Sequence, residues 1–435
     1  MKFEQLQQFR QLAYQCLGNA KDATFELADA VMTTRHVSCL GDFALGPLFE
    51  RQWSSAYEAL QDCRPDRERL MQLYIQQMSQ EERPVLAIDH TAWLRPHAPT
   101  LKERTYEHQP TVLPRNRPVG IGQGYSTIAL IPSTSGSWAL PLRHERITSW
   151  DNPIAKAAQQ LAQVCQYLQH RPIVLFDSEY GCAPLVEATG AIEADKLMRI
   201  CSNRCLWSTP GSYSGKGRPK VHGNLFKLNN SQTWWEPEQT WETQQPKIGT
   251  IRLKQWDNLH FRGCPKHSMT LILVERLDTV TGRLKTQPLW LVWLGIQMPP
   301  LAEIWQLYLR RFALEHWYRL AKQTLHWTVP QLSTPEQCER WSDLMPLLTW
   351  QLWLAQDLVK EIRLPWQKPL AQLTPGRVAQ SMLPLLIKIG SPAIAPKPRG
   401  NSTRWPPGKT RAPRCHYPVV KKGKGRFQNS SKSIS

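Results

Sequence analysis

The stretch Tyr308-Leu-Arg-Arg-Phe-Ala-Leu-Glu-His-Trp-Tyr-Arg-Leu-Ala-Lys322 contains no glycine or proline and is rich in residues that favour helix. We place Tyr308 at zero on a helix of about 3.6 residues per turn. Arg311, Glu315 and Lys322 then lie at about 300°, 340° and 320°, so all four polar side chains fall within an arc of about 60°. The stretch therefore predicts an amphipathic helix that carries a phenol, a carboxylate and two cations on one stripe.

A solvated helix face is the simpler interpretation of this stripe. Arg311 and Glu315 stand at i and i+4, a spacing at which an exposed ion pair contributes only about 0.2–0.5 kcal/mol. One such pair carries no functional information. A functional interpretation requires further acids elsewhere in the chain to accompany Glu315.

Two apolar runs upstream each end in an aspartate. Pro84-Val-Leu-Ala-Ile-Asp89 and Pro172-Ile-Val-Leu-Phe-Asp177 are typical of fully buried strands with the acid at the carboxyl end. An Asp that begins a turn is the alternative for either run taken alone. Ligands bind at the carboxyl ends of parallel strands in α/β sheets, so we expect Asp89 and Asp177 to lie together. Glu179 and Asp195 are nearby competitors, and the strand-end position favours Asp177 over Glu179.

The spacing Tyr-x2-Arg-x3-Glu-x6-Lys over Tyr308–Lys322 resembles the signature of the DDE-type insertion-sequence transposases of bacteria. Three more stretches are similar to that family: Gly217-Arg-Pro-Lys-Val-His-Gly223, Pro288-Leu-Trp-Leu-Val-Trp293 and Leu373-Thr-Pro-Gly-Arg377. The resemblance spans nearly the whole chain and implies an α/β fold with a ribonuclease-H-like core. Further strands near Gly124–Pro132, Ser137–Arg143 and Lys196–Cys201, with helices after Asn152 and over Ala183–Thr189, agree in order with that core.

The resemblance also implies the residue roles. The catalytic and metal-binding acids would be Asp89, Asp177 and Glu315. The residues that handle the transposon end would be Tyr308, Arg311 and Lys322. The cofactors would be two divalent metal ions, Mg²⁺ or Mn²⁺, which suit carboxylate ligands and phosphoryl transfer.

The function implied is a DNA transposase that cuts transposon ends and transfers the freed strand into target DNA. Its partners would be the inverted-repeat ends and target DNA, bound by a homodimer or higher oligomer. Two alternatives stay open: a ribonuclease-H-like nuclease that joins nothing, and a DNA-binding protein derived from a transposase that has lost catalysis.

The chain is expected to divide into five parts. These are a helical N-terminal domain for end binding or dimerisation (1–83), the catalytic core (84–204 and 295–332), a β-rich insertion (205–294), C-terminal helices (333–390) and a basic disordered tail (391–435). The tail has the low-complexity Pro, Gly and Ser content that cannot form a core. Tryptophans in the insertion, Trp234 and Trp235 among them, are candidates to stack on DNA bases.

Composition points to a polyanionic partner. The 435 residues carry a formal charge of +19, and eleven Lys and Arg lie in the tail without any Asp or Glu. The basic loop Lys216-Gly-Arg218-Pro-Lys220 adds a second candidate phosphate contact. No apolar run reaches the roughly 18 residues of a membrane helix, so we expect an intracellular protein. The resemblance implies that it is a cytoplasmic bacterial protein that associates with the nucleoid when bound to DNA.

Ten cysteines scattered through the chain indicate reduced thiols. A zinc site built from Cys201, Cys205, Cys264 and His267 is an alternative, but its loose spacing favours ordinary buried cysteines.

Overall fold

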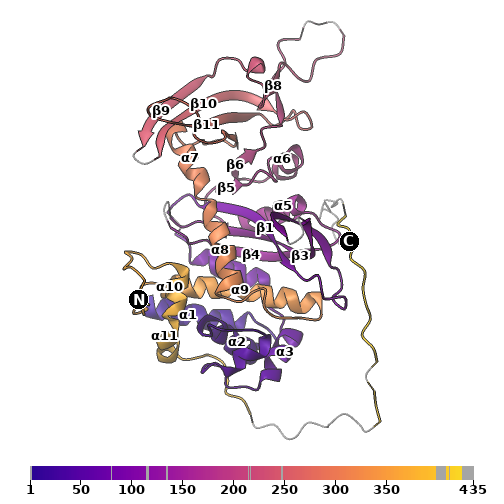
Figure 1. Cartoon of the computed structure of the whole chain (residues 1–435), viewed down its shortest axis with the longest axis vertical. Coiled ribbons are helices and arrows are strands. Elements are labelled where there is room, and N and C mark those ends of the chain that lie inside the picture. The colour runs from indigo at the N-terminus through magenta and orange to yellow at the C-terminus, as the bar shows by residue number, and fades with distance from the viewer. Residues whose placement is uncertain are drawn as a thin grey trace.

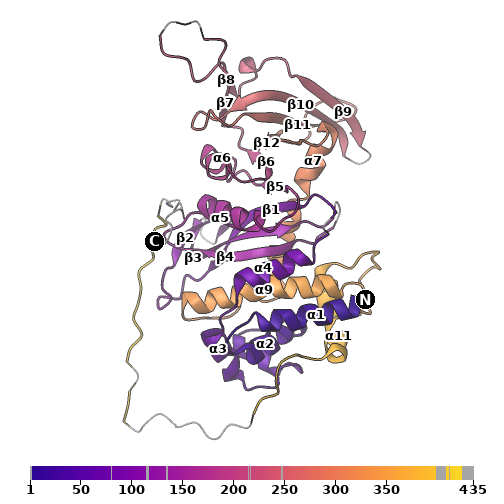
Figure 2. The same cartoon turned by 180° about the vertical axis from the view of Figure 1, so that it is seen from behind.

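The structure is a computed structural model that describes residues 2–79, 81–113, 117–133, 136–213, 215, 217–245, 248–397, 408–410 and 412–423. Within these residues the fold is mixed α/β, with eleven α-helices and one large mixed sheet of twelve strands. Figures 1 and 2 show the sheet running through the upper and middle parts of the molecule, with most of the N- and C-terminal helices below it. The mixed α/β class expected from the sequence is confirmed.

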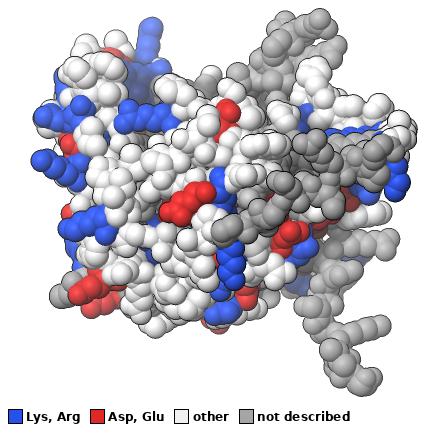
Figure 3. Space-filling model, turned by 90° about the horizontal axis from the view of Figure 1, so that it is seen from below, with Lys and Arg blue, Asp and Glu red and all other residues white. Residues whose placement is uncertain are grey.

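The N-terminal region is helical. It comprises α1 (Lys2–Gln15), α2 (Lys21–Thr33), the 3₁₀ helix η1 (Leu40–Leu45), α3 (Trp53–Asp62) and α4 (Arg67–Gln76). Asp66 begins α4, since its side chain accepts a hydrogen bond from the backbone N–H of Arg69 at 3.0 Å. Leu6 and Phe9 on α1 are buried at helical spacing, and α1 packs against α9 (Pro335–Ala355). In Figure 3 the described surface at this end shows basic and acidic side chains interspersed among uncharged ones.

The sheet begins with strands from the middle of the chain. They are β1 (Val85–Leu94), β2 (Thr105–Leu113), β3 (Arg117–Leu130), β4 (Leu140–Ile147), β5 (Ile173–Phe176) and β6 (Asp195–Ile200). The order is β4-β3-β1-β5-β6, with β2 beside the first half of β3. β1, β5 and β6 are parallel, whereas β3 is antiparallel to β1. Parallel pairing of β1 with β5 ends at Ile88, but antiparallel pairing with β3 carries β1 on to Leu94. Asp89 is therefore inside a strand rather than at its tip.

The insertion continues the same sheet. Its elements are β7 (Cys205–Ser208), β8 (Leu225–Lys227), η2 (Ser231–Thr233), β9 (Gln239–Gln245), β10 (Gly249–His260), β11 (Met269–Leu277) and β12 (Leu289–Leu294). β12 pairs antiparallel with β6, and β11, β10, β7 and β8 follow outward. Trp234 stacks on Phe226, with ring centroids 5.8 Å apart, and belongs to an aromatic cluster in this part of the sheet.

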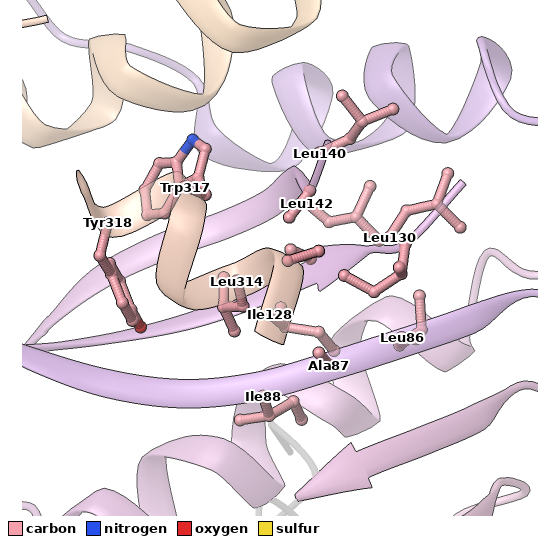
Figure 4. Packing of buried hydrophobic residues seen from close by; sticks show 14 of the residues in the cluster. Leu86, Ala87, Ile88, Ile128, Leu130, Leu140, Leu142, Leu314, Trp317 and Tyr318 are labelled. Carbon is pink, nitrogen blue, oxygen red and sulfur yellow. The ribbon is translucent and has the colours of Figure 1, made fainter. Parts of the chain in front are cut away.

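Helices cover both faces of the central strands. α5 (Pro153–Cys165) and α6 (Ala183–Thr189) lie together, and α5 packs on β3 and β4. Asn152 begins α5, as expected, because its side chain accepts from the backbone N–H of Ala155. Against the other face, α8 (Phe312–Gln323) lies on β1 and the long α9 on β4. Figure 4 shows Leu314 and Trp317 of α8 packed over Ile128 and its neighbours.

The helix expected over Tyr308–Lys322 is divided in two. α7 (Leu301–Leu309) ends and α8 begins around Arg310 and Arg311, where the N–H of Arg311 bonds to the carbonyl of Tyr308. The two helices have different partners, since α7 contacts β9 and β10 of the insertion whereas α8 contacts β1. Packing against two parts of the sheet thus breaks a segment whose local propensity favours one continuous helix.

The C-terminal region combines short helices with a docked segment. α9 is followed by α10 (Pro375–Gln380) and α11 (Met382–Ile389). The sequence predicts disorder from residue 391 onward, but residues 417–420 run along the edge of β2. The N–H of Tyr417 bonds to the carbonyl of Pro99, and that of Val420 to Arg104, both at 2.8 Å. An edge strand offers unpaired backbone groups, which explains why this segment docks there. Residues 398–407, 411 and 424–435 of the tail lie outside the described residues.

Candidate active site

The two predicted aspartates lie side by side at the carboxyl end of the parallel strands. Ile88 of β1 is paired with Phe176 of β5, and each is followed at once by its acid, Asp89 or Asp177. Neighbouring strands are about 4.8 Å apart, so the register alone makes the two acids neighbours. Backbone donors hold one oxygen of each carboxylate. The N–H of His90 donates to Oδ1 of Asp89 at 2.8 Å, and the N–H of Ser178 donates to Oδ1 of Asp177.

Arg311 joins these two acids to the third. Its Nη2 donates a hydrogen bond to Oε1 of Glu315 at 2.8 Å. Its Nη1 lies 3.6 Å from Oδ2 of Asp89 and 3.9 Å from Oδ2 of Asp177, which is too far for hydrogen bonds. Three acids from β1, the end of β5 and the first turn of α8 therefore surround one guanidinium group.

Burial sets the electrostatics of this cluster. Only 3% of the Arg311 side chain and 16% of the Asp89 side chain are exposed, against 48% for Glu315. Burial raises the pKa of Asp89 to about 7, although the Arg311 charge opposes the shift. The pKa of Arg311 is raised because the neighbouring acidic groups outweigh the effect of its burial. Within the described residues Nη1 and Nε of Arg311 have no hydrogen-bond partner, although they are buried. Such unsatisfied groups are rare in structural ion pairs.

The remaining residues of the predicted stripe also face β1. Lys322 donates from Nζ to Oγ1 of Thr91 at 2.7 Å, two residues beyond Asp89 on the same face. Burial lowers the pKa of Lys322. Tyr308 is buried, and its ring centroid is 5.8 Å from the guanidinium carbon of Arg311. Tyr308 thus stays beside Arg311, and Arg311 beside Glu315, across the break between α7 and α8.

Sequence reasoning missed two groups that support Asp89. The hydroxyl of Tyr318 donates to the backbone carbonyl of Asp89 at 2.9 Å, and its oxygen lies 3.0 Å from Oγ1 of Thr127. Tyr318 stands three residues after Glu315, so helical spacing was the signal that could have found it. The ring of His90 lies 2.9 Å from the hydroxyl of Tyr180, and nothing in the sequence indicates that contact.

The two competing acids have other roles in the structure. Asp195 is fully buried at the start of β6, where it accepts from Arg83 and Arg171 and from the backbone N–H groups of Ile296 and Gln297. These bonds satisfy it as a structural residue.

Glu179 instead is largely exposed, with its carboxylate 3.3 Å from Nε2 of His90. Burial lowers the pKa of His90 to about 4, so this contact is not an ion pair at neutral pH, and Glu179 forms no ion pair with Arg311.

The basic loop lies far from the acidic cluster. Arg218 and Lys220 are exposed, whereas Lys216 lies outside the described residues. The loop precedes β8, which is separated from β1 by seven strand steps of about 4.8 Å, or about 34 Å. Figure 1 shows β8 near the top of the molecule and α8 near its middle. Any contact of the loop with DNA is thus made at a different place from the acids.

The residue types of the acidic cluster fit divalent metal ions. Mg²⁺ and Mn²⁺ prefer carboxylate oxygens, and no described residue donates a hydrogen bond to Oδ2 of Asp89 or of Asp177. In the part of the chain that the structure describes, no three His, Cys, Asp or Glu side chains converge closely enough to enclose an ion, and this includes Cys201, Cys205, Cys264 and His267, the disfavoured zinc alternative. Arg311 supplies the positive charge among the three acids.

A comparison with protein-family models agrees with this geometry. The model described as DDE superfamily endonuclease matches residues 13–260, which is more than half of the chain. The chain belongs to this family. The match includes Asp89 and Asp177 and ends before Glu315.

The DDE-type family expected from the sequence is confirmed, and membership implies a nuclease that acts on DNA. A search of curated proteins found no match to this DDE endonuclease. Among its described helices, none is both long enough and apolar enough to cross a membrane.

Proposed function

We propose that this DDE endonuclease is a transposase that cuts the ends of its element and joins them to target DNA. The observation that carries the proposal is the convergence of Asp89, Asp177 and Glu315 on one buried arginine. Three features support phosphoryl transfer at this acidic cluster: its carboxylate side chains, its place at the carboxyl end of parallel strands and the family to which the chain belongs. The strand order β4-β3-β1-β5-β6, with β1 parallel to β5 and β6, supports a ribonuclease-H-like core into which the strands from β7 to β12 are inserted.

Asp89, Asp177 and Glu315 would hold two divalent ions. When bound, such ions activate the attacking water or hydroxyl and offset charge on the scissile phosphate. The protein's own contribution is to hold the acids in place. Backbone N–H groups fix one oxygen of each aspartate, and Tyr318 fixes the carbonyl of Asp89, so the second oxygen of each aspartate is left without a backbone donor.

The cations of the stripe would then bind the DNA end. Arg311 carries two buried donors that no described residue uses, and a phosphate oxygen would satisfy them. Lys322 stands on the same face and would contact an adjacent phosphate. Arg218, Lys220 and Lys216 would hold duplex further from the cut, and a dimer or higher oligomer would bring two ends together.

The test is metal-dependent cleavage of a duplex that carries the inverted repeat flanking the coding segment. We expect nicking at the repeat end in Mg²⁺ or Mn²⁺ and none in EDTA. Asp89→Asn, Asp177→Asn and Glu315→Gln should each lose cleavage while end binding persists. Glu179→Gln is the matched control and should still cut, because Glu179 contacts His90 instead of Arg311. A triad variant that cuts normally removes that residue from the site.

A second assay separates cutting from joining. A pre-nicked end that already carries a 3′-hydroxyl is mixed with plasmid target, and joined products are counted. Joining supports the transposase. Cleavage without joining would favour a simple nuclease, and binding without cleavage would favour a DNA-binding protein that has lost catalysis.

A further inference from the structure

Residues 417–423, the docked segment, are held in one place on the protein by backbone hydrogen bonds as well as by charge. Besides the two backbone bonds of Tyr417 and Val420 to the chain before β2, the N–H of Gly423 bonds to the carbonyl of Ser149 at 2.6 Å. Val420 forms a parallel β-bridge with Thr105. The segment is thus held at the start of β2 and just after the end of β4, with a single β-bridge to the sheet.

Lys422 is the anchor of the docked segment. Its Nζ forms an ion pair of 2.7 Å with Oε2 of Glu107, whose side chain is only 5% exposed. Glu107 also accepts from the hydroxyl of Thr105. A Cβ on Gly124 would stand 2.9 Å from both Nζ of Lys422 and Oε2 of Glu107, so the glycine leaves the room that this ion pair occupies. A buried carboxylate that would otherwise lack a cation gives the lysine a defined place.

The position of this anchor relative to the acids follows from strand register. Gly124 of β3 is paired with Ala92 of β1, which is three residues beyond Asp89. At about 3.3 Å per residue, Lys422 therefore docks about 10 Å along the strand from Asp89, and on the opposite face of the sheet, because successive side chains alternate. The segment lies on the part of β1, β2 and β3 that projects past the carboxyl end of β5.

The docked segment and the residues just before it present cations to solvent, with Lys421 inside the segment and Arg414 three residues before it. Lys421 and Arg414 are exposed, and neither forms an ion pair with any described residue. Lys422 is already paired with Glu107. Lys421 and Arg414 therefore remain available to bind an anion near the acids.

We propose that residues 412–423 form a second contact for duplex DNA beside the catalytic edge, in which Lys422 anchors the segment while Lys421 and Arg414 bind phosphates next to the cut. The inference rests on the proposed function for its substrate. It differs from a loose electrostatic arm because it assigns the contact to one place on the DNA.

Site-directed crosslinking tests that place. Lys421→Cys is made with the exposed cysteines Cys39, Cys201 and Cys415 replaced by serine, and the thiol carries a photoactivated crosslinker. Glu315→Gln is added and EDTA is present, so binding is measured without cleavage. We expect crosslinks within about one helical turn, roughly 10 base pairs, of the predicted cut. Crosslinks scattered evenly along the duplex would overturn the proposal.

Salt dependence supplies a charge-matched comparison. Arg414→Gln with Lys421→Gln removes two charges from residues 412–423, and Lys397→Gln with Arg399→Gln removes two from the start of the same tail. The first pair should reduce the slope of log K against log salt on end-containing duplex by about 1–2, near 0.9 for each phosphate contact. An equal or smaller reduction than that of the second pair would overturn the proposal.

A third variant tests the anchor without changing the exposed cations. Glu107→Gln with Lys422→Met removes both partners of the buried pair, which is gentler than leaving one unpaired. Circular dichroism checks that the protein is folded. The crosslinks from position 421 should then spread along the DNA, and an unchanged pattern would show that docking does not place Lys421. If the parent protein binds ends but never cuts them, the proposed function is wrong. The crosslinking and salt results still test the DNA contact of residues 412–423, because they measure binding only.

Discussion

Two buried clusters of charge in this molecule are built in opposite ways. At the junction of α4, β4 and α9, Arg143 donates to Glu145 at 2.7 Å and to Glu68 at 2.6 Å. The neighbouring Arg146 donates to Glu103 and Glu339, both at 2.7 Å. Every one of these carboxylates has a close cationic donor. In the acidic cluster, the guanidinium of Arg311 is the shared cation of three acids, and it makes a hydrogen bond to only one of them, Glu315.

The pKa values express the same contrast. Burial would raise the pKa of Glu145, but Lys156 and Arg143 lower it to about 2. Burial raises the pKa of Asp89 to about 7, because the distant Nη1 of Arg311 offsets too little of the cost. Glu145 and Asp89 are similarly buried, but their pKa values differ because Glu145 has close cationic partners and Asp89 does not. Satisfied charges hold parts of a fold together, whereas unsatisfied ones mark a place where a ligand completes the site.

The largest expected effect concerns the satisfied cluster. Arg143→Met removes one partner from two carboxylates and leaves Glu145 buried without its arginine, which should reduce the free energy of unfolding by about 3–5 kcal/mol. Denaturant titration measures the loss. Arg319→Met, at an exposed arginine of α8, is the control and should change little. A loss below about 1 kcal/mol for Arg143→Met would contradict the contrast drawn between the clusters.

The corresponding substitution in the acidic cluster should reduce the cleavage rate and not the stability of the fold. Arg311→Gln removes the donors proposed for phosphate and should slow end cleavage by about 10²–10³-fold, as for the loss of one preorganised donor. The free energy of unfolding should change by no more than about 1 kcal/mol, because Arg311 makes only one hydrogen bond to the acids and Asp89 can take up a proton. A stability loss as large as that of Arg143→Met would make Arg311 a structural residue.

Metal affinity should depend on pH through Asp89. A metal ligand must be ionised, and the pKa of Asp89 is about 7. The affinity for Mn²⁺ should therefore rise about tenfold per pH unit below 7, or about 1.4 kcal/mol, and level off above it. Calorimetric titration at pH 6, 7 and 8 checks this, and an affinity that does not change with pH would exclude Asp89 as a ligand that titrates in this range.

Stability of the metal-free protein should respond to pH in opposite directions at the two clusters. The raised pKa of Asp89 stabilises the fold at low pH, and this stability is lost as pH rises from about 4 to about 7. The lowered pKa of Glu145 stabilises the fold above about pH 4, and this is lost as pH falls toward 2. Asp89→Asn should flatten only the first change and Glu145→Gln only the second, as followed by thermal unfolding. If the two variants had identical profiles of stability against pH, the predicted difference between the two clusters would be wrong.

The smallest expected effect is at a residue outside both clusters. His316 is exposed on α8, next in sequence to Glu315, and its ring makes no described contact with the acids. His316→Gln should leave the cleavage rate within about twofold and the free energy of unfolding within about 0.5 kcal/mol. A loss comparable to that of Arg311→Gln would mean that any charge change on this helix matters.

Much of the site could be predicted from short patterns. Apolar runs ending in Asp89 and Asp177 indicated parallel buried strands, and the structure pairs those strands in the register that makes the acids neighbours. Helical spacing placed Arg311 and Glu315 on one side, where they do form an ion pair. These patterns were sufficient because each depends on residues within one strand or one helix turn. The catalytic roles of the residues stay predictions.

Other features had no local signal. The break at Arg310 and Arg311 arises because α7 and α8 pack against different parts of the sheet. Asp195 stands beside a strand, as the site acids do, yet two arginines from loops elsewhere in the chain make it structural. A tail with the composition of a disordered segment includes Lys422, which reaches a buried glutamate on β2.

By itself, the sequence determined the mixed α/β class, the two acid-bearing strands and the acid-bearing helix, since hydrophobic period and capping act over a few residues. Only the tertiary structure decided which acids share a cation. The three acids come from β1, the end of β5 and α8, and their contacts with Arg311 depend on how these elements pack. It likewise decided that Glu145 is satisfied and Asp89 is not, because burial and charge separation are properties of the assembled core.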